Sequence, residues 1–169
     1  LYSGAAGGTT AASGALTLGG LSGALTGVVK NDNATVPAAI TTATLLNNTG
    51  GASPGVGTAV VADGDSFTVN GKTITFKAGA APLAASAPTG FGIDAGAASV
   101  ATDGNGNSLI YIGASSTTST ATVGDVLRAI DLASGVRSST VASGVATTAT
   151  NAGQTVSSIT AGAVSLQTS

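Results

Sequence analysis

The 169-residue sequence contains no cysteine, histidine, methionine or tryptophan, and every acidic residue is an aspartate. Without cysteine or histidine, the chain lacks the ordinary protein ligands of zinc, copper, haem and iron–sulfur centres. It also lacks the commonest general base and the thiol nucleophile. No disulfide can form, so an extracellular location would need another source of stability. We therefore expect no metal, no cofactor and no enzymatic activity.

Charge is scarce as well. Charged side chains make up 7% of the residues and the formal net charge is −2, so the chain has no electrostatic basis for binding nucleic acid. No run of about 18 apolar residues occurs, so we expect no membrane-spanning helix and no membrane partner. Leu1-Tyr2-Ser3 lacks the basic and apolar segments of a signal peptide. Because there is also no initiating methionine, we expect an internal piece of a longer protein.

The abundant residues are small or hydroxylated. Alanine supplies 33 residues, and serine and threonine together supply 45. A fully buried large apolar side chain contributes about 1.5–3 kcal/mol, and alanine contributes much less. The composition therefore predicts a thin core for the length of the chain, with a large share of the stability coming from backbone hydrogen bonds.

Residues 59–79 give the strongest β signal. Asn70-Gly71 lies between two alternating runs and favours a type I′ hairpin turn, because both residues tolerate a positive φ. The turn aligns Val69 with Lys72. One face of this hairpin then carries four apolar side chains that we predict to cover the main core: Phe67, Val69, Ile74 and Phe76.

A second hairpin is predicted between residues 98–102 and 108–113, joined by residues 103–107. Leu109-Ile110-Tyr111-Ile112 is a dense run of β-forming residues. Residues 80–98 separate the two hairpins and hold two of the four prolines. We therefore predict a loop there.

One helix is predicted, over residues 122–136. Thr122 is placed to cap its N-terminus, and Asp125 completes a capping box with aspartate in the position of the usual glutamate. Gly135 is a natural C-terminal stop.

The predicted helix is amphipathic. Its apolar face has the spacing i, i+3, i+4, i+7 and consists of Val123, Val126, Leu127 and Ile130. Arg128 and Asp131 are expected on its outer side. Because the first hairpin and the helix are the only strongly amphipathic elements, we predict that their apolar faces pack on each other. The predicted fold class is mainly β with one clear helix (α+β).

The remaining segments give weaker signals. Residues 1–35 fit short strands and loops, or a mobile linker, because their many glycines oppose a long helix. Residues 36–46 fit a strand or a short helix, and residues 47–58 a loop. Residues 137–169 alternate serine, threonine, alanine and valine and are predicted to form strands, with one or two of them in 154–167.

Three stretches resemble, in order, the variable outer region of bacterial flagellins, especially the long flagellins of alphaproteobacteria such as the bradyrhizobia. They are DGDSFTVNGKTITFKAGAAP at 63–82, ATDGNGNSLIYIG at 101–113 and ATVGDVLRAIDLASGV at 121–136. The hairpin around Asn70-Gly71, followed by a helix, is similar to the repeating unit of flagellin outer domains. That unit has a helix ending in Ile-Asn, where this chain has Ile130-Asp131. The resemblance covers residues 59–137, under half of the chain.

This sequence departs from flagellins in one large respect. Flagellins polymerise through helical end segments with heptad-like apolar spacing, and no such segment is present. The resemblance therefore implies the outer domain alone: a structural, extracellular part of the motility filament that decorates its surface and contacts neighbouring subunits. It assigns no filament-core role to any residue.

The resemblance also implies a two-lobed arrangement. Residues 59–137 would form a distal lobe, carried on a base lobe of paired strands from residues 1–58 and 138–169. If the chain leaves the filament core and returns to it, Leu1 and Ser169 should lie on the same side, within about 15 Å of each other.

Two other functions stay open. An adhesin or S-layer module binding carbohydrate or a host surface would fit the same composition, and long heptad-bearing helices in the flanking sequence would distinguish a flagellin from it. An enzyme such as a surface hydrolase would need an acidic pair in a deep cleft.

Two acidic patterns deserve a chemical interpretation. Asp103-Gly-Asn-Gly-Asn107 resembles the start of a calcium loop, but the twelfth position is Ala114 in place of glutamate, so a plain hairpin loop is favoured. Asp63 and Asp65 could act as paired catalytic carboxylates. Without histidine or a second acidic cluster, we favour a solvated entrance to the strand.

Two kinds of glycosylation pattern are present. Asn33-Ala-Thr35 and Asn47-Asn-Thr49 satisfy N-x-[ST], which we attribute to chance. The flagellin resemblance implies O-linked glycan instead, with residues 115–120 and 138–140 as candidates. The alternative for both runs is solvated polar surface.

Overall fold

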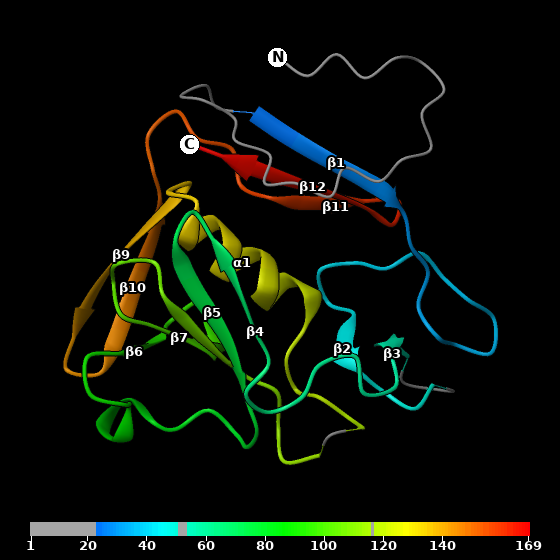
Figure 1. Ribbon diagram of the computed structural model, residues 1–169, viewed down its shortest axis with the longest axis horizontal. Helices are drawn as coiled ribbons and strands as arrows, with labels where there is room; N and C mark the ends of the chain where they lie inside the picture. Colours follow the sequence, from blue (N-terminus) through cyan, green and yellow to red (C-terminus); the bar gives the residue numbers. More distant parts are fainter. Residues whose placement is uncertain (1–22, 51–53, 116) are drawn as a thin grey trace.

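The computed structural model describes residues 23–50, 54–115 and 117–169. Within them the fold is mainly β with a single α-helix, α1 (Val123–Ala133), so the predicted fold class is confirmed. Figure 1 shows this helix between a large sheet and a small sheet that lies above it.

The large sheet has seven strands, in the order β4-β5-β8-β7-β6-β10-β9. Their bounds are β4 Ser66–Val69, β5 Lys72–Lys77, β8 Ser108–Tyr111, β7 Ala97–Thr102, β6 Gly92–Asp94, β10 Val145–Thr150 and β9 Arg137–Ala142. β5 and β8 run parallel, as do β6 and β10, and the other neighbours are antiparallel. Sequence-adjacent hairpins are therefore joined into one sheet by two parallel pairings.

The first predicted hairpin is confirmed in its register. Phe67 pairs with Ile74 and Val69 with Lys72, across a turn in which Asn70 has φ 49° and Gly71 has φ 73°. Both angles lie in the left-handed region that a type I′ turn requires. The rings of Phe67 and Phe76 lie 6.1 Å apart, centroid to centroid.

The second hairpin, β7 with β8, is also confirmed. The loop predicted over 80–98 is wrong in part, because it contains β6 and a short 3₁₀ helix, η1 (Ala84–Ser86). β6 has only three residues and begins with Gly92, so it carries too little pattern to be recognised. Gly92 is required there because a Cβ would lie 2.7 Å from the backbone nitrogen of Ala146 in β10.

Helix α1 begins as predicted. The Thr122 side chain accepts the Asp125 N–H, and the Asp125 carboxylate accepts the Thr122 N–H at 2.8 Å. Beyond the C-terminus of α1, Gly135 has φ 81°, the left-handed conformation expected of a helix stop. Asn151 supports this turn by donating to the Gly135 carbonyl at 2.8 Å.

The core lies between α1 and the large sheet. Its buried members are Leu46, Ile74, Phe76, Ile110, Ile112, Ala121, Val123, Leu127, Ala129 and Ala133. Of the eight side chains expected there, four belong to this cluster: Ile74, Phe76, Val123 and Leu127. The other four are partly buried and pack against it: Phe67, Val69, Val126 and Ile130.

The expected outer position of Arg128 and Asp131 is wrong. Arg128 forms an ion pair with the buried carboxylate of Asp94 in β6. Asp131 is only 2% exposed, and its two carboxylate oxygens accept the Ser157 N–H at 3.0 and 3.2 Å. Both side chains lie outside the apolar stripe of the helix, as the spacing predicts. Strands and loops nevertheless cover the helix at these positions, so Arg128 and Asp131 bond to protein groups there and not to solvent.

The small sheet has three strands in the order β1-β12-β11, with β1 at Gly23–Val29, β12 at Ala163–Thr168 and β11 at Ser158–Thr160. The C-terminal residues 154–167 thus contain β11 and most of β12. A separate parallel pair joins β2 (Leu45–Asn47) to β3 (Gly55–Gly57). The segment 36–46, expected to form a strand or a short helix, therefore contains only the start of β2. The segment 47–58, expected to be a loop, contains β3.

The boundary between the large and the small sheet does not fall at residue 138, where the base lobe was expected to resume. β1 and β11 both pair with β12, as a base lobe would require, but β9 and β10 extend the large sheet. The division between the two sheets falls between β10 and β11. The expected position of Leu1 lies outside the described residues. The first described residue, Gly23, pairs with Thr168.

Candidate functional site

The loop after β7 is held by its own side chains. The Asp103 carboxylate accepts the backbone N–H of Asn105 at 2.8 Å and of Asn107 at 3.1 Å, and it accepts the Asn107 side-chain amide at 2.7 Å. The Asn107 amide oxygen accepts the Thr73 N–H at 2.9 Å, which ties this loop to the first hairpin. Across the described residues, no group of three or more Asp side chains could hold a metal ion. The geometry is that of a plain hairpin loop.

Asp63 and Asp65 also accept hydrogen bonds from backbone N–H groups near them. Asp63 accepts the Ala78 N–H at 2.8 Å and lies 3.6 Å from the Lys77 ammonium. The hydrogen bond from Ala78, together with the positive charge of Lys77, lowers the pKa of Asp63 below its usual value. Asp65 accepts the Ala62 N–H at 2.8 Å. These contacts hold the turn that precedes β4.

Both N-x-[ST] asparagines are engaged in structural hydrogen bonds. Asn33 donates to the Asn48 carbonyl at 2.6 Å and accepts the Gly55 N–H at 2.8 Å. Asn47 is fully buried, and its amide both donates to and accepts from the Val61 backbone, at 2.7 and 3.0 Å. Neither amide nitrogen is available to carry a glycan without breaking these contacts.

The hydroxyl run after β8 combines an anchor with exposed side chains. Ser119 is buried; its hydroxyl donates to the Ala121 carbonyl at 2.8 Å and accepts the Asn47 N–H at 3.1 Å. The other described members of the run, Ser115, Thr117, Thr118 and Thr120, are exposed, and residue 116 lies outside the described part of the chain. On β9, Ser138 and Thr140 are exposed and Ser139 is half-buried. Accessible hydroxyls are therefore presented by a loop and by an edge strand.

A polar cluster that the sequence did not predict lies between α1 and the large sheet. Arg128 donates to both oxygens of Asp94, with Nη2 2.8 Å from Oδ1, and it also donates to the Thr148 hydroxyl. The Asp94 side chain is fully buried, and 19% of the Arg128 side chain is exposed. The only signal in the sequence was an arginine in a helix that carries three charged residues among its 11, in a chain where charge is scarce. The cluster fastens the helix to β6 and β10 and has no free reactive group.

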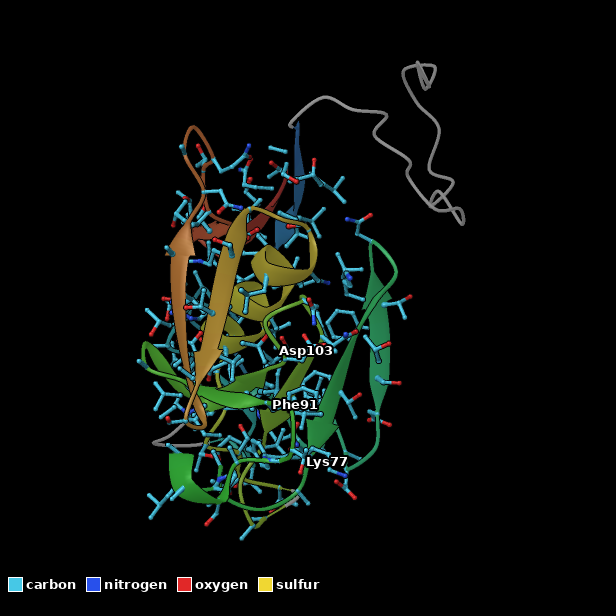
Figure 2. All side chains as sticks on the ribbon, turned by 90° about the vertical axis from the view of Figure 1, so that its left-hand side faces the viewer. Lys77, Phe91 and Asp103 are labelled. Carbon is cyan, nitrogen blue, oxygen red and sulfur yellow. The ribbon has the colours of Figure 1, made fainter. Side chains whose placement is uncertain are left out.

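One side of the molecule illustrates how its charges are dispersed. Figure 2 shows Lys77 at the end of β5, Phe91 just before β6 and Asp103 just after β7, spaced along this side and not gathered around one point. The two charged groups each bond within their own neighbourhood.

The surface features that do stand out are sheet edges and exposed apolar side chains. The exposed large apolar residues are Leu25, Val28, Val29, Val36, Val60, Leu83 and Val145. Three of these, Leu25, Val28 and Val29, are in one edge strand, β1. No helix in the described residues has the length and apolar character needed to cross a membrane.

Comparison with known proteins yields one match. The family model described as Domain of Unknown Function (DUF1522) matches residues 15–169. No curated protein and no solved structure matches the chain.

Proposed function

We propose that this chain, which belongs to the DUF1522 family, is the surface-exposed outer domain of a bacterial flagellin. It would decorate the flagellar filament outside the cell and contribute nothing to the filament core. In this role it is a structural protein without catalytic activity, and its partners are neighbouring flagellin subunits.

The observation that carries the proposal is the order of the three flagellin-like stretches and their common core. The first stretch supplies the hairpin β4–β5, the second supplies β8, and the third supplies α1. Ile74, Ile110 and Leu127, one from each stretch, are buried in the same cluster. The resemblance therefore extends over a unit that packs together, which is what a shared outer-domain unit requires.

Two further features support this role. Gly23 and Thr168 are paired neighbours, so the described chain enters and leaves the fold at one place, as suits a domain carried on a filament core. The surface has few charges, since the whole chain has five basic and seven acidic residues. Crowded copies can then approach one another with little long-range repulsion.

Immunogold electron microscopy tests the proposal. Antibodies raised against this chain should label isolated flagellar filaments along their length. Cells whose gene lacks the codons for residues 23–168 should form filaments that are thinner and unlabelled, which provides the matched control. Label confined to the cell envelope would reject the flagellin assignment and would favour an adhesin or S-layer module.

We also propose that the hydroxyl run 115–120 carries O-linked glycan on the filament. Thr117 and Thr118 are exposed, while Ser119 is committed to hydrogen bonds. Mass spectrometry of the filament protein should find glycan adducts on a peptide that covers this run, and replacing Thr117 and Thr118 by alanine should reduce them. Peptides of unmodified mass throughout would contradict this assignment.

A further inference from the structure

We propose that the free edge of β1 binds β1 of a second copy of this chain, so that two small sheets join across a two-fold axis. This inference deepens the proposed function, because it names the surface through which neighbouring outer domains touch.

β1 is the outermost strand of the small sheet. It pairs with β12 on one side, and among the described strands none pairs with its other side. In Figure 1 it lies at the outer margin of the molecule, beyond β12. An edge strand of this kind presents unpaired N–H and C=O groups to any strand that can approach it.

The side chains of β1 are unusually apolar for such a position. Leu25 is 52% exposed, Val28 73% and Val29 61%. Leu25 pairs with Leu166, and Leu166 packs against the core, so Leu25 extends a core-facing apolar surface beyond the body of the protein. A contact at this edge would therefore bury apolar area as well as satisfy backbone groups.

The other edge strands of the two larger sheets are shorter than β1. β4 has four residues, β9 has six and β11 has three. β1 has seven residues, Gly-Ala-Leu-Thr-Gly-Val-Val, with no charge and no proline. One irregularity in its register with β12, between Thr26 and Val29, is a protective feature of the usual kind.

The absence of charge in β1 favours a second copy as the partner over a charged one. Antiparallel pairing of β1 with itself brings no like charges together, and each strand offers the other the same apolar side chains. A charged partner would find no complementary charge in this strand. In a filament, neighbouring copies are also held close together, so a contact that is weak in free solution becomes populated by its high effective concentration.

Sedimentation equilibrium of the isolated chain tests the inference. The mass should rise from that of a monomer toward that of a dimer as the concentration approaches about 1 mM, the dissociation constant typical of a weak contact. Leu25→Lys should weaken the dimer at least about tenfold, because a lysine on an edge strand opposes strand pairing. Leu83→Lys is the matched control: Leu83 is 81% exposed and lies outside the strands, so this variant should associate like the wild type.

A second measurement identifies what covers the edge. Amide hydrogen exchange at the β1 N–H groups that do not donate to β12 should slow as the protein concentration rises. A chain that stays monomeric, a dimer that Leu25→Lys leaves intact, or protection of these same N–H groups at every concentration would each overturn the inference. The last result would mean that another segment of the same chain covers the strand. Thermal unfolding of both lysine variants shows whether each is folded, and filament labelling is unaffected by any of these outcomes, so the two proposals fail separately.

Discussion

Arg128 in α1 and Asp94 in β6 form an ion pair beneath the surface, although 34 positions separate them in the sequence. The carboxylate has no exposed area, and the guanidinium is the group that compensates its burial. Thr148 in β10 completes the contact by accepting from Arg128. Three elements of the fold are thus held by one charged group.

We predict that Arg128→Ala destabilises the protein by about 3–5 kcal/mol, because it leaves the Asp94 carboxylate buried without its counter-ion. Urea unfolding followed by circular dichroism measures this change in the free energy of unfolding. Lys77→Ala is the control, since the Lys77–Asp63 pair is 44% and 57% exposed and solvent screens exposed pairs so that they contribute little to stability. Equal losses in the two variants would contradict the prediction.

This ion pair shows what the sequence could not reveal. The period of α1 places Arg128 on the side of the helix away from the apolar stripe, but only the pairing of β6 with β10 determines that the sheet covers this side as well. β6 has three residues and a glycine at its start, so the local pattern gave no reason to expect a strand there. The position of β6 depends on its pairing with β7 and with β10. β10 is distant in the sequence, and the residues of β6 themselves contain no pattern that indicates either pairing.

Local chemistry, in contrast, predicted the first hairpin and the helix start. Asn70-Gly71 determines the position of the turn, and the turn determines that Phe67 pairs with Ile74. Thr122 and Asp125 determine the beginning of α1 through side chains three residues apart. These features depend on neighbours in the sequence, so a single chain is enough to recognise them.

Leu127→Ala should cost about 2–5 kcal/mol, because Leu127 is 5% exposed in the cluster between helix and sheet and its truncation leaves a cavity. Thermal or urea unfolding provides the measurement. Leu83→Ala removes the same atoms from a side chain that is 81% exposed, so it should change the stability little. A small effect at Leu127 would mean that the core can collapse around the missing atoms.

The capping box predicts a smaller loss. Thr122→Ala removes the acceptor of the Asp125 N–H, and such changes cost about 0.5–2 kcal/mol. Thr122→Ser keeps the hydroxyl and should retain most of the stability. Urea unfolding of both variants tests whether the hydroxyl is responsible, and equal losses would instead point to the methyl group.

Asp63 provides the last prediction, which concerns pH. The hydrogen bond from the Ala78 N–H and the charge of Lys77 both favour the ionised carboxylate and lower its pKa from the usual value of 3.8. Because the folded-state pKa lies below the unfolded one, the contribution of Asp63 to stability is fully present above the unfolded pKa. It is lost as the pH falls through the lower, folded-state pKa.

NMR titration of the Asp63 carboxyl carbon should therefore give a midpoint below 3.8. In Lys77→Ala the midpoint should rise only part of the way, because the larger cause of the shift, the Ala78 hydrogen bond, remains. Lys72→Ala is the matched control, since Lys72 lies at the opposite end of β5 from Lys77 and should leave the midpoint unchanged. A full return to 3.8 in Lys77→Ala would show that the ammonium, and not the backbone N–H, holds the carboxylate in its charged form.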